Sequence, residues 1–251
     1  MSLPIQIKHS SGNYKADLHH PIDISIPMEA GPGHVSAWYV DPVRMEPVKS
    51  ENWIGEVKQG GSVNFRNIFF NPHGHGTHTE CVGHITPEIY SVNEHLKEYF
   101  CLARLITITP EAVGEDGIIS RRQLEKSVPE GTEALVIRTL PNPESKLKKA
   151  YSNTNPPYLS KEAAEFLCER NVKHLLIDLP SVDREQDEGK LSAHHAFWNY
   201  PTKTRFDATI TELVYIPDQI NDGLYLLNLQ VAPFVNDASP SRPVLFAITS
   251  V

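Results

Sequence analysis

Four histidines and one glutamate lie within the twelve residues 73–84 of this chain, which read His-Gly-His-Gly-Thr-His-Thr-Glu-Cys-Val-Gly-His. Side chains of an extended chain alternate between two faces, so His78, Glu80 and His84 would point to one side. On a helix, the first two of these would lie on opposite sides. Imidazole and carboxylate groups together suit Zn, Mn or Fe. We therefore interpret the segment as a metal site on an extended chain; the alternative is a solvated polar turn.

A carboxylate and a histidine pair further along the chain are also candidates for a site. Glu212 lies in an apolar run, where burying an unpaired carboxylate is costly and a bound metal would remove that cost. The alternative is an edge strand that turns Glu212 towards water. His194 and His195 follow the acidic loop 183–189. Because adjacent side chains generally point apart, we expect either that one of them enters a site or that both form a surface pair.

The segment 76–84 resembles the signature of the cyclase-type metal-dependent hydrolases, a family that includes bacterial kynurenine formamidase and isatin hydrolase. The family pattern is His-x-Gly-Thr-His-x-Asp-x-Pro-x-His. Four residues are in register with it: Gly76, Thr77, His78 and His84. The resemblance implies that these two histidines belong to a metal-dependent active site.

Three positions depart from the family pattern. Glu80 stands in place of Asp and keeps the carboxylate on a longer side chain, and Val82 stands in place of Pro. Gly74 occupies the position of the first histidine, between His73 and His75. A shift of one residue in this glycine-containing loop would return either histidine to the metal, and we favour His73.

The resemblance extends over most of the chain in the same order and is weakest in the region 110–160. Five further segments carry it: 22–28, 176–183, 194–198, 210–213 and 239–244. It implies the family's swivelling β/β/α fold and a late metal ligand at Glu212. It favours His194 over His195 as the active-site histidine. Since family members commonly form homo-oligomers, it also implies a homo-oligomer.

The elements that must position these residues are predicted from apolar runs and capping residues. Nine short runs rich in aliphatic or aromatic residues predict strands: 22–26, 35–40, 63–70, 102–109, 134–139, 174–179, 208–215, 224–231 and 244–249. One helix is predicted over 86–99, where Thr86 and Pro87 suit its first turn, and another from Ser160 to Arg170.

This order of elements predicts an α/β fold in a single domain, residues 1–251, with a mixed sheet and covering helices. The polar, Pro-rich region 139–159 is predicted to be a loop or insertion. Its Lys146–Lys149 run is interpreted as a solvated face. Cys81 has the opposite parity to the proposed ligands and is expected to be a small packed residue.

Composition excludes several classes of partner. The net charge of −8 and the lack of a long basic run argue against nucleic acid. No run approaches the ~18 apolar residues of a membrane span, and the N-terminal residues do not form a signal peptide. Three scattered cysteines make no disulfide framework. We expect a cytoplasmic protein with a small-molecule substrate and no membrane or nucleic-acid partner.

The sequence therefore predicts a metal-dependent amidohydrolase, similar to arylformamidases, that cleaves a C–N bond of a formamide or cyclic amide through a metal-activated water. One or two divalent ions, Zn in preference to Mn, would be held by five residues: His73, His78, Glu80, His84 and Glu212. His194 would move a proton to the leaving nitrogen or act as an extra ligand. Aromatic residues either line a substrate pocket or belong to the core: Trp38, Tyr39, Phe69, Phe70 and Trp198.

Two other functions remain open at this stage. The departures at Glu80 and Val82 also suit a non-catalytic protein that binds a metal or small molecule on the same scaffold. A metal-dependent dehydratase or cyclase would share the ligands, but it would remove water where a hydrolase adds it.

Overall fold

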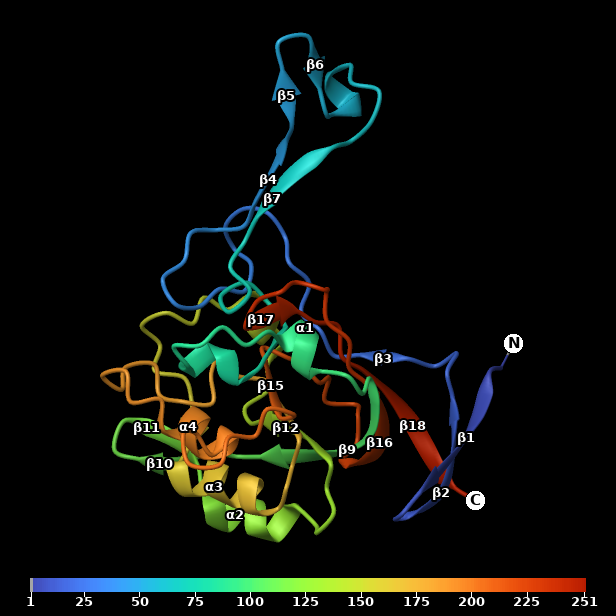
Figure 1. The fold of residues 1–251 in the computed structure, drawn as a ribbon, viewed down its shortest axis with the longest axis vertical. Helices are drawn as coiled ribbons and strands as arrows, with labels where there is room; N and C mark the ends of the chain where they lie inside the picture. The colour runs from blue at the N-terminus through green and yellow to red at the C-terminus, as the bar shows by residue number, and fades with distance from the viewer. Residues whose placement is uncertain (1) are drawn as a thin grey trace.

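One large mixed β-sheet organises the chain in the computed structural model, which describes residues 2–251 (Figure 1). The strands follow the order β1-β2-β18-β16-β9-β12-β14-β15-β8-β17, and β3 pairs with β18. Their bounds are β1 (Pro4–His9), β2 (Gly12–Asp17), β3 (Ile22–Asp23), β8 (His78–Glu80), β9 (Phe100–Ile108), β12 (Ala134–Thr139), β14 (His174–Ile177), β15 (Thr209–Glu212), β16 (Gly223–Asn228), β17 (Ala238–Pro240) and β18 (Val244–Ser250).

The centre of the sheet consists of four parallel strands, β9, β12, β14 and β15. A parallel strand is buried on both faces, so it reads as a continuous apolar run. In β12, Leu135 and Ile137 pack into the core on the helical side, whereas Ala134 and Val136 pack into the core on the other side. The predicted strand at 134–139 is thus confirmed.

Three helices cover one face of this sheet (Figure 1): α2 (Arg121–Ser127), α3 (Lys161–Glu169) and α4 (Ser192–Trp198). The side chain of Ser160 accepts a hydrogen bond from the Ala163 amide, which is the N-cap predicted from the sequence. α3 buries one face of small and apolar residues against the sheet, including Ala164 and Leu167. The single-domain α/β fold with covering helices is therefore confirmed.

The helix predicted over 86–99 is wrong for most of its length. Only α1 (Val92–His95) is helical, and Ser91 caps it. The backbone here bonds to a distant loop, because the Val92 amide donates to Asn236 O. The strand predicted at 35–40 is also wrong. Trp38 and Tyr39 both adopt positive φ angles, which end an extended chain.

The region 139–159 is more ordered and more buried than predicted. It contains a 3₁₀ helix (Glu144–Lys148) and β13 (Tyr158–Leu159), which joins β10 (Glu111–Val113) and β11 (Asp116–Ile119) in a small sheet. Lys146 is buried, and its ammonium lies 2.7 Å from the Asp178 carboxylate and also donates to Thr139. The solvated face proposed for Lys146–Lys149 is therefore wrong at Lys146.

A narrow arm projects from the sheet (Figure 1, upper part). It contains β4 (Arg44–Pro47), β5 (Lys49–Ser50), β6 (Trp53–Ile54), a 3₁₀ turn (Val57–Gln59) and β7 (Arg66–Phe69). Among the described strands, β4 pairs only with β7 and β5 only with β6, and all four side chains of β7 are exposed. Within residues 2–251, no helix combines the length and hydrophobicity needed to cross a membrane.

Candidate metal centre

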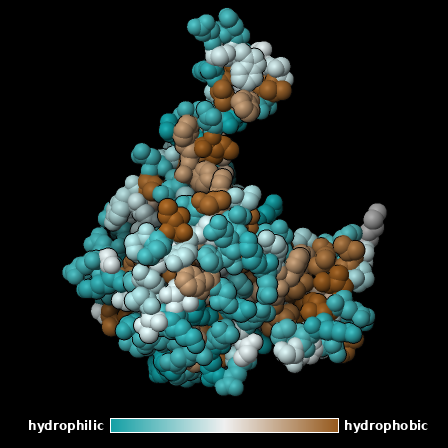
Figure 2. All heavy atoms as spheres, in the orientation of Figure 1, coloured by the Kyte–Doolittle hydropathy of each residue, from teal (hydrophilic) through white to brown (hydrophobic). Residues whose placement is uncertain are grey.

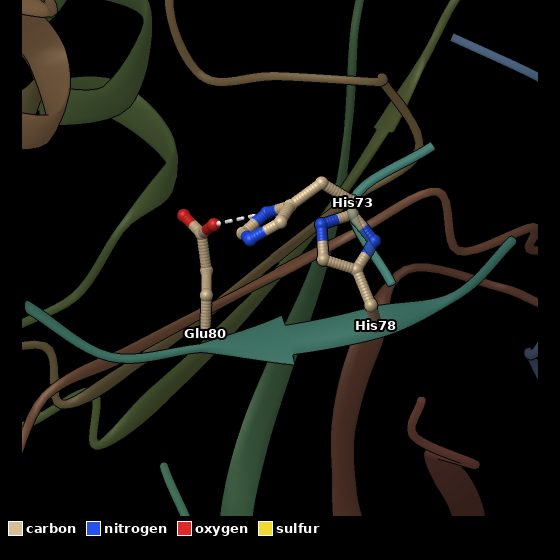
Figure 3. A group of neighbouring side chains, drawn as sticks. All are labelled: His73, His78 and Glu80. Atoms are coloured by element: carbon tan, nitrogen blue, oxygen red, sulfur yellow. Dashed lines mark ion pairs between the residues drawn. The ribbon is translucent and has the colours of Figure 1, made fainter. Parts of the chain in front are cut away.

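The predicted site residues meet where strands β14 and β15 end and the short strand β8 crosses beside them. In open α/β sheets, ligands bind at the carboxyl ends of parallel strands. His78 and Glu80 are two residues apart on β8 and rise from the same face of the strand (Figure 3). Glu212, the last residue of β15, is the direct partner of His78 in the antiparallel ladder. Backbone register thus places these three side chains together.

Two further histidines reach the centre from turns on either side of β8. Gly76 has a φ of 113°, which lets the chain turn between His73 and β8. Beyond β8, a 3₁₀ turn (Val82–Ile85) brings His84 back to the site. The expectation of an extended chain as far as His84 is therefore wrong beyond Glu80. The turn requires glycine at position 83, where a Cβ would lie only 2.2 Å from Tyr90 O.

Glu80 is the centre of this group and is fully buried. His73 Nδ1 lies 3.1 Å from its Oε2 atom (Figure 3), and His84 Nε2 lies 3.9 Å from the same atom. Its Oε1 atom lies 3.0 Å from His194 Nε2. The two oxygens of one carboxylate therefore face different histidines.

Glu212 lies beside His78 and His194 in the centre. Its Oε2 atom lies 3.4 Å from His78 Nε2, and its Oε1 atom lies 3.9 Å from His194 Nε2. The amide of Val182 also donates to Oε1, at 3.0 Å. The buried position of Glu212 differs from the alternative of an edge carboxylate in water.

The sequence left a choice between His73 and His75 and between His194 and His195, and the structure places one of each pair in the centre. His73 lies in the group, whereas His75 is turned away: its Nδ1 accepts from the Asn71 amide and its Nε2 contacts Asp41 O. His194 points to Glu80, whereas His195 lies beside Tyr200 on the other side of α4.

Each histidine nearest the carboxylates has an acceptor on its far ring nitrogen. His73 Nε2 lies 2.9 Å from Asp237 Oδ2, and His194 Nδ1 lies 2.6 Å from Asp183 Oδ2. His78 Nδ1 lies 3.0 Å from Gly76 O. Such acceptors keep a proton on the far nitrogen and leave the near nitrogen free to bind a metal.

Sequence reasoning missed both Asp183 and Asp237. Asp183 was visible only as part of an acidic loop, although it also accepts the amides of Ala193 and His194 at the start of α4. Asp237 lies 164 positions from His73, and no local pattern around it signals a site. Only the pairing of β17 with β8 brings it there.

Electrostatic interactions in the ion-free centre are strong. Burial alone would lower the pKa of His73, but the carboxylates of Asp237 and Glu80 raise it to about 10. The pKa of His194 is likewise raised well above its ordinary value, against burial, by Asp183 and Glu80. Burial raises the pKa of Glu80, but the surrounding imidazoles outweigh it and hold that pKa well below its ordinary value. The centre therefore stabilises positive charge.

The donor atoms fit a divalent metal. His78 Nε2 and Glu80 Oε2 are buried, and neither makes a hydrogen bond within the described residues. Buried polar atoms are normally hydrogen-bonded, so two neighbouring buried atoms without a hydrogen bond are suited to bind a cation. One ligand atom each from His73, His78 and Glu80 lie within 4.8 Å of one another, as do those of Glu80, His84 and His194.

The aromatic candidates divide between core and surface. Trp198 is fully buried, and its ring centre lies 5.5 Å from that of His194. Phe70 contacts Phe234, which lies close in sequence to Asp237. Tyr39 is exposed, and its hydroxyl donates to Glu185. Cys81 is buried, as expected for a packed residue.

Comparison with known proteins identifies relatives of this chain. The family model "Putative cyclase" matches residues 16–184. Kynurenine formamidase from Bacillus thuringiensis (strain Al Hakam) is 32% identical over 231 residues, covering 89% of this chain and 96% of the relative. The enzyme of the same name from Bacillus anthracis is 30% identical over 231 residues, with the same coverage of both chains.

Solved structures show the same fold. A structure described as a potential metal-dependent hydrolase with cyclase activity has a TM-score of 0.65 at 16% identity, covering 91% of this chain and 98% of that one. Isatin hydrolase A from Labrenzia aggregata has a TM-score of 0.65 at 17% identity, covering 91% and 93%. The matched family model and the curated relatives together show that this chain belongs to the cyclase family.

Proposed function

We propose that the protein is a metal-dependent hydrolase that cleaves the C–N bond of a small formamide or cyclic amide. The observation that carries the proposal is that two buried atoms, His78 Nε2 and Glu80 Oε2, have no hydrogen bond within the described residues and lie among further imidazole and carboxylate groups. The names of the relatives, kynurenine formamidase and isatin hydrolase, support an aromatic formamide or cyclic amide as substrate. A divalent ion would polarise the carbonyl and lower the pKa of bound water.

His73, His78, Glu80, Glu212 and His194 are proposed to hold the metal. All five face the buried centre, and the far nitrogens of the three histidines are held by other acceptors. The two Glu80 oxygens face different histidines, which is compatible with one or two ions. Nitrogen and oxygen donors suit Zn, our first choice, and also Mn.

The histidine that moves protons is proposed to be His84. The sequence allowed His194 either as a proton carrier or as an extra ligand, and burial favours the ligand. The His194 side chain is 2% exposed and its Nδ1 is engaged by Asp183, whereas the His84 side chain is 29% exposed. A group that passes a proton to a leaving nitrogen must reach both substrate and solvent.

The experiment that tests the proposal combines metal analysis with product mass. Protein purified without added metal or chelator should contain a stoichiometric divalent metal. An N-formyl arylamine or a cyclic imide should gain one water on turnover, and chelation should abolish that turnover. Unchanged turnover after complete metal removal would refute the proposal. Metal without turnover would instead favour a binding protein, and loss of water would favour a dehydratase or cyclase.

We also propose that the chain forms a homo-oligomer through the arm, residues 43–70. Six large apolar side chains are exposed on it: Trp53, Val57, Val63, Phe65, Ile68 and Phe69. Figure 2 shows this apolar surface along the projecting arm. A standard interface buries ~1,600 Å² in total, or about 800 Å² per copy, and twofold symmetry would repeat each contact of the arm in the partner copy.

Charge on the arm is compatible with binding a second copy. The arm contains four basic residues, Arg44, Lys49, Lys58 and Arg66, and three acidic ones, whereas the whole chain has a net charge of −8. Its docking on another copy is therefore not opposed by like charge. A cytoplasmic location is proposed as well, supported by the three free cysteines of the described residues.

A further inference from the structure

We propose that Asp237 is a positioning residue that fixes the orientation and the protonated nitrogen of both His73 and His84. The inference rests on the metal centre proposed above. Asp237 does not face the Glu80 carboxylate; it contacts the two histidines from the opposite side, as the distances to their ring nitrogens indicate.

The backbone of Asp237 is fixed by the sheet itself. It directly precedes β17, whose residue Ala238 is paired with Glu80 in the ladder. Its carbonyl oxygen accepts the Cys81 amide at 3.0 Å. The backbone that carries this carboxylate is therefore hydrogen-bonded to the segment that contributes His78 and Glu80, which fixes its position relative to them.

One oxygen of Asp237 serves two imidazoles. Its Oδ2 atom lies 2.9 Å from His73 Nε2 and 3.3 Å from His84 Nδ1. The two rings are stacked, with centres 4.2 Å apart and planes inclined by 29°. A carboxylate accepts only, so each of these ring nitrogens must carry a proton to bond to it.

The ring nitrogens that face the centre follow from this arrangement. With Nε2 of His73 bound to Asp237, its Nδ1 faces Glu80 Oε2 at 3.1 Å and is the nitrogen that would bind a metal. With Nδ1 of His84 bound to Asp237, its Nε2 faces the same Glu80 oxygen at 3.9 Å and is free to accept a proton. The Asp237 carboxylate thus leaves Nδ1 of His73 to bind the metal and Nε2 of His84 to accept a proton.

A second carboxylate, Asp183, contacts a single histidine in the same way on the far side of Glu80. Within the described part of the chain, Asp183 contacts one ring nitrogen, that of His194, at 2.6 Å, and both side chains are buried. Asp237 is partly exposed and shared between two rings. Loss of Asp183 should therefore affect one donor, whereas loss of Asp237 should affect two groups with different tasks.

Asp237→Asn tests the proposal, with Asp207→Asn as the matched control because Asp207 is exposed and pairs only with Lys173 among the ion pairs of the described residues. Co²⁺ is the probe: its affinity is measured by competition with a chromophoric chelator, and its visible spectrum reports ligand geometry. We expect Asp237→Asn to bind Co²⁺ about 10–100-fold more weakly, with an altered spectrum, and the control to match wild type.

The possible outcomes separate the inference from the proposed function. If wild type binds no Co²⁺, the metal centre itself is refuted. If wild type binds Co²⁺ and Asp237→Asn binds it with the same affinity and the same spectrum, the positioning role is refuted while the metal centre stands. Asp237→Ser, which removes the carboxylate without adding bulk, is judged by the same criteria if the Asn variant does not fold.

Discussion

The candidate metal centre and the arm depart from ordinary protein surfaces in opposite directions. The centre buries polar atoms: Glu80 is 0% exposed, and its Oε2 atom has no hydrogen bond within the described residues. The arm exposes apolar ones: Phe65 is 57% exposed. Burying an unpaired polar group is costly, and so is exposing a contiguous apolar surface. Each region therefore indicates a binding partner, a cation in one case and a protein surface in the other.

The two regions also differ in how firmly they are held. β8 is bonded to β15 on one edge and to β17 on the other, so His78 and Glu80 lie in a continuous sheet. The arm is a ribbon of paired strands with no third strand. A two-stranded ribbon is only marginally stable in water. Strand pairing therefore preorganises the proposed metal centre, whereas the arm would gain stability from the proposed association.

The largest effect should come from removing the charge at the centre. Glu80→Gln keeps the side-chain length but loses the negative charge that faces three histidines, so metal affinity should fall by more than about 100-fold. The oligomeric state should not change, because Glu80 is far from solvent. Metal competition titration and sedimentation measure the two properties, with the exposed residue Glu88 changed to Gln as the control. Wild-type metal affinity in Glu80→Gln would exclude this carboxylate as a ligand.

The next prediction concerns the removal of exposed apolar side chains from the arm. The double substitution Phe65→Ser and Ile68→Ser removes two exposed apolar side chains, at about 1.5–3 kcal/mol each if they are buried on association. The proposed homo-oligomer should dissociate at concentrations at which wild type is assembled, while metal content stays at the wild-type level. Sedimentation equilibrium measures the dissociation, and Val113→Ser, an exposed apolar change outside the arm, is the control. An unchanged oligomer would place the interface elsewhere.

The sequence predicted the parts of the structure that depend on residues close together in the chain. The strand over 134–139 and the helix that follows Ser160 depend on local apolar runs and a local cap, and both were predicted. The chemistry of the segment 73–84 could also be predicted, because it depends on the residue types themselves. The arm was not predicted as an arm, since β4 and β5 contain few apolar residues and their pairing depends on turns.

The errors have the same origin. The segment 86–99 has a helix-like start, but its backbone is bonded to a loop about 140 residues away in sequence. Lys146 belongs to a charged run, but it reaches inwards to Asp178, 32 residues away. Asp237 approaches His73 through strand pairing alone. Contacts between distant segments leave no local pattern in a single sequence, so these parts required the structure.

A smaller effect is expected from changing the reach of the carboxylate. Glu80→Asp restores the residue of the family pattern but shortens the side chain by about 1.5 Å. Metal–oxygen distances tolerate only about ±0.2 Å, so affinity should fall roughly 10-fold or more while the fold remains intact. The same competition titration measures it. Equal metal binding by the Asp and Glu forms would mean that Glu80 is not a direct ligand and only supports its neighbours.

The smallest effect uses a histidine that is buried outside the centre. His174 lies at the start of β14 and contacts the Thr209 hydroxyl, with no carboxylate bonded to its ring. Burial and then Lys173 lower its pKa from 6.5 to about 4, opposite to the shift of His194. As pH falls below 6.5, the unfolded chain binds a proton at this site that the folded chain does not, so stability decreases until pH 4.

Between pH 7.5 and pH 5.5, this histidine should therefore cost wild type about 1 kcal/mol of unfolding free energy. His174→Gln lacks the titrating group and should not show that part of the loss. Urea unfolding of both proteins at the two pH values measures the difference, and the other histidines cancel because both chains share them. If the two proteins lose the same stability, the His174 side chain takes up its proton equally well in the folded state. Burial alone would then not explain why the pKa of His174 differs from that of the histidines in the centre.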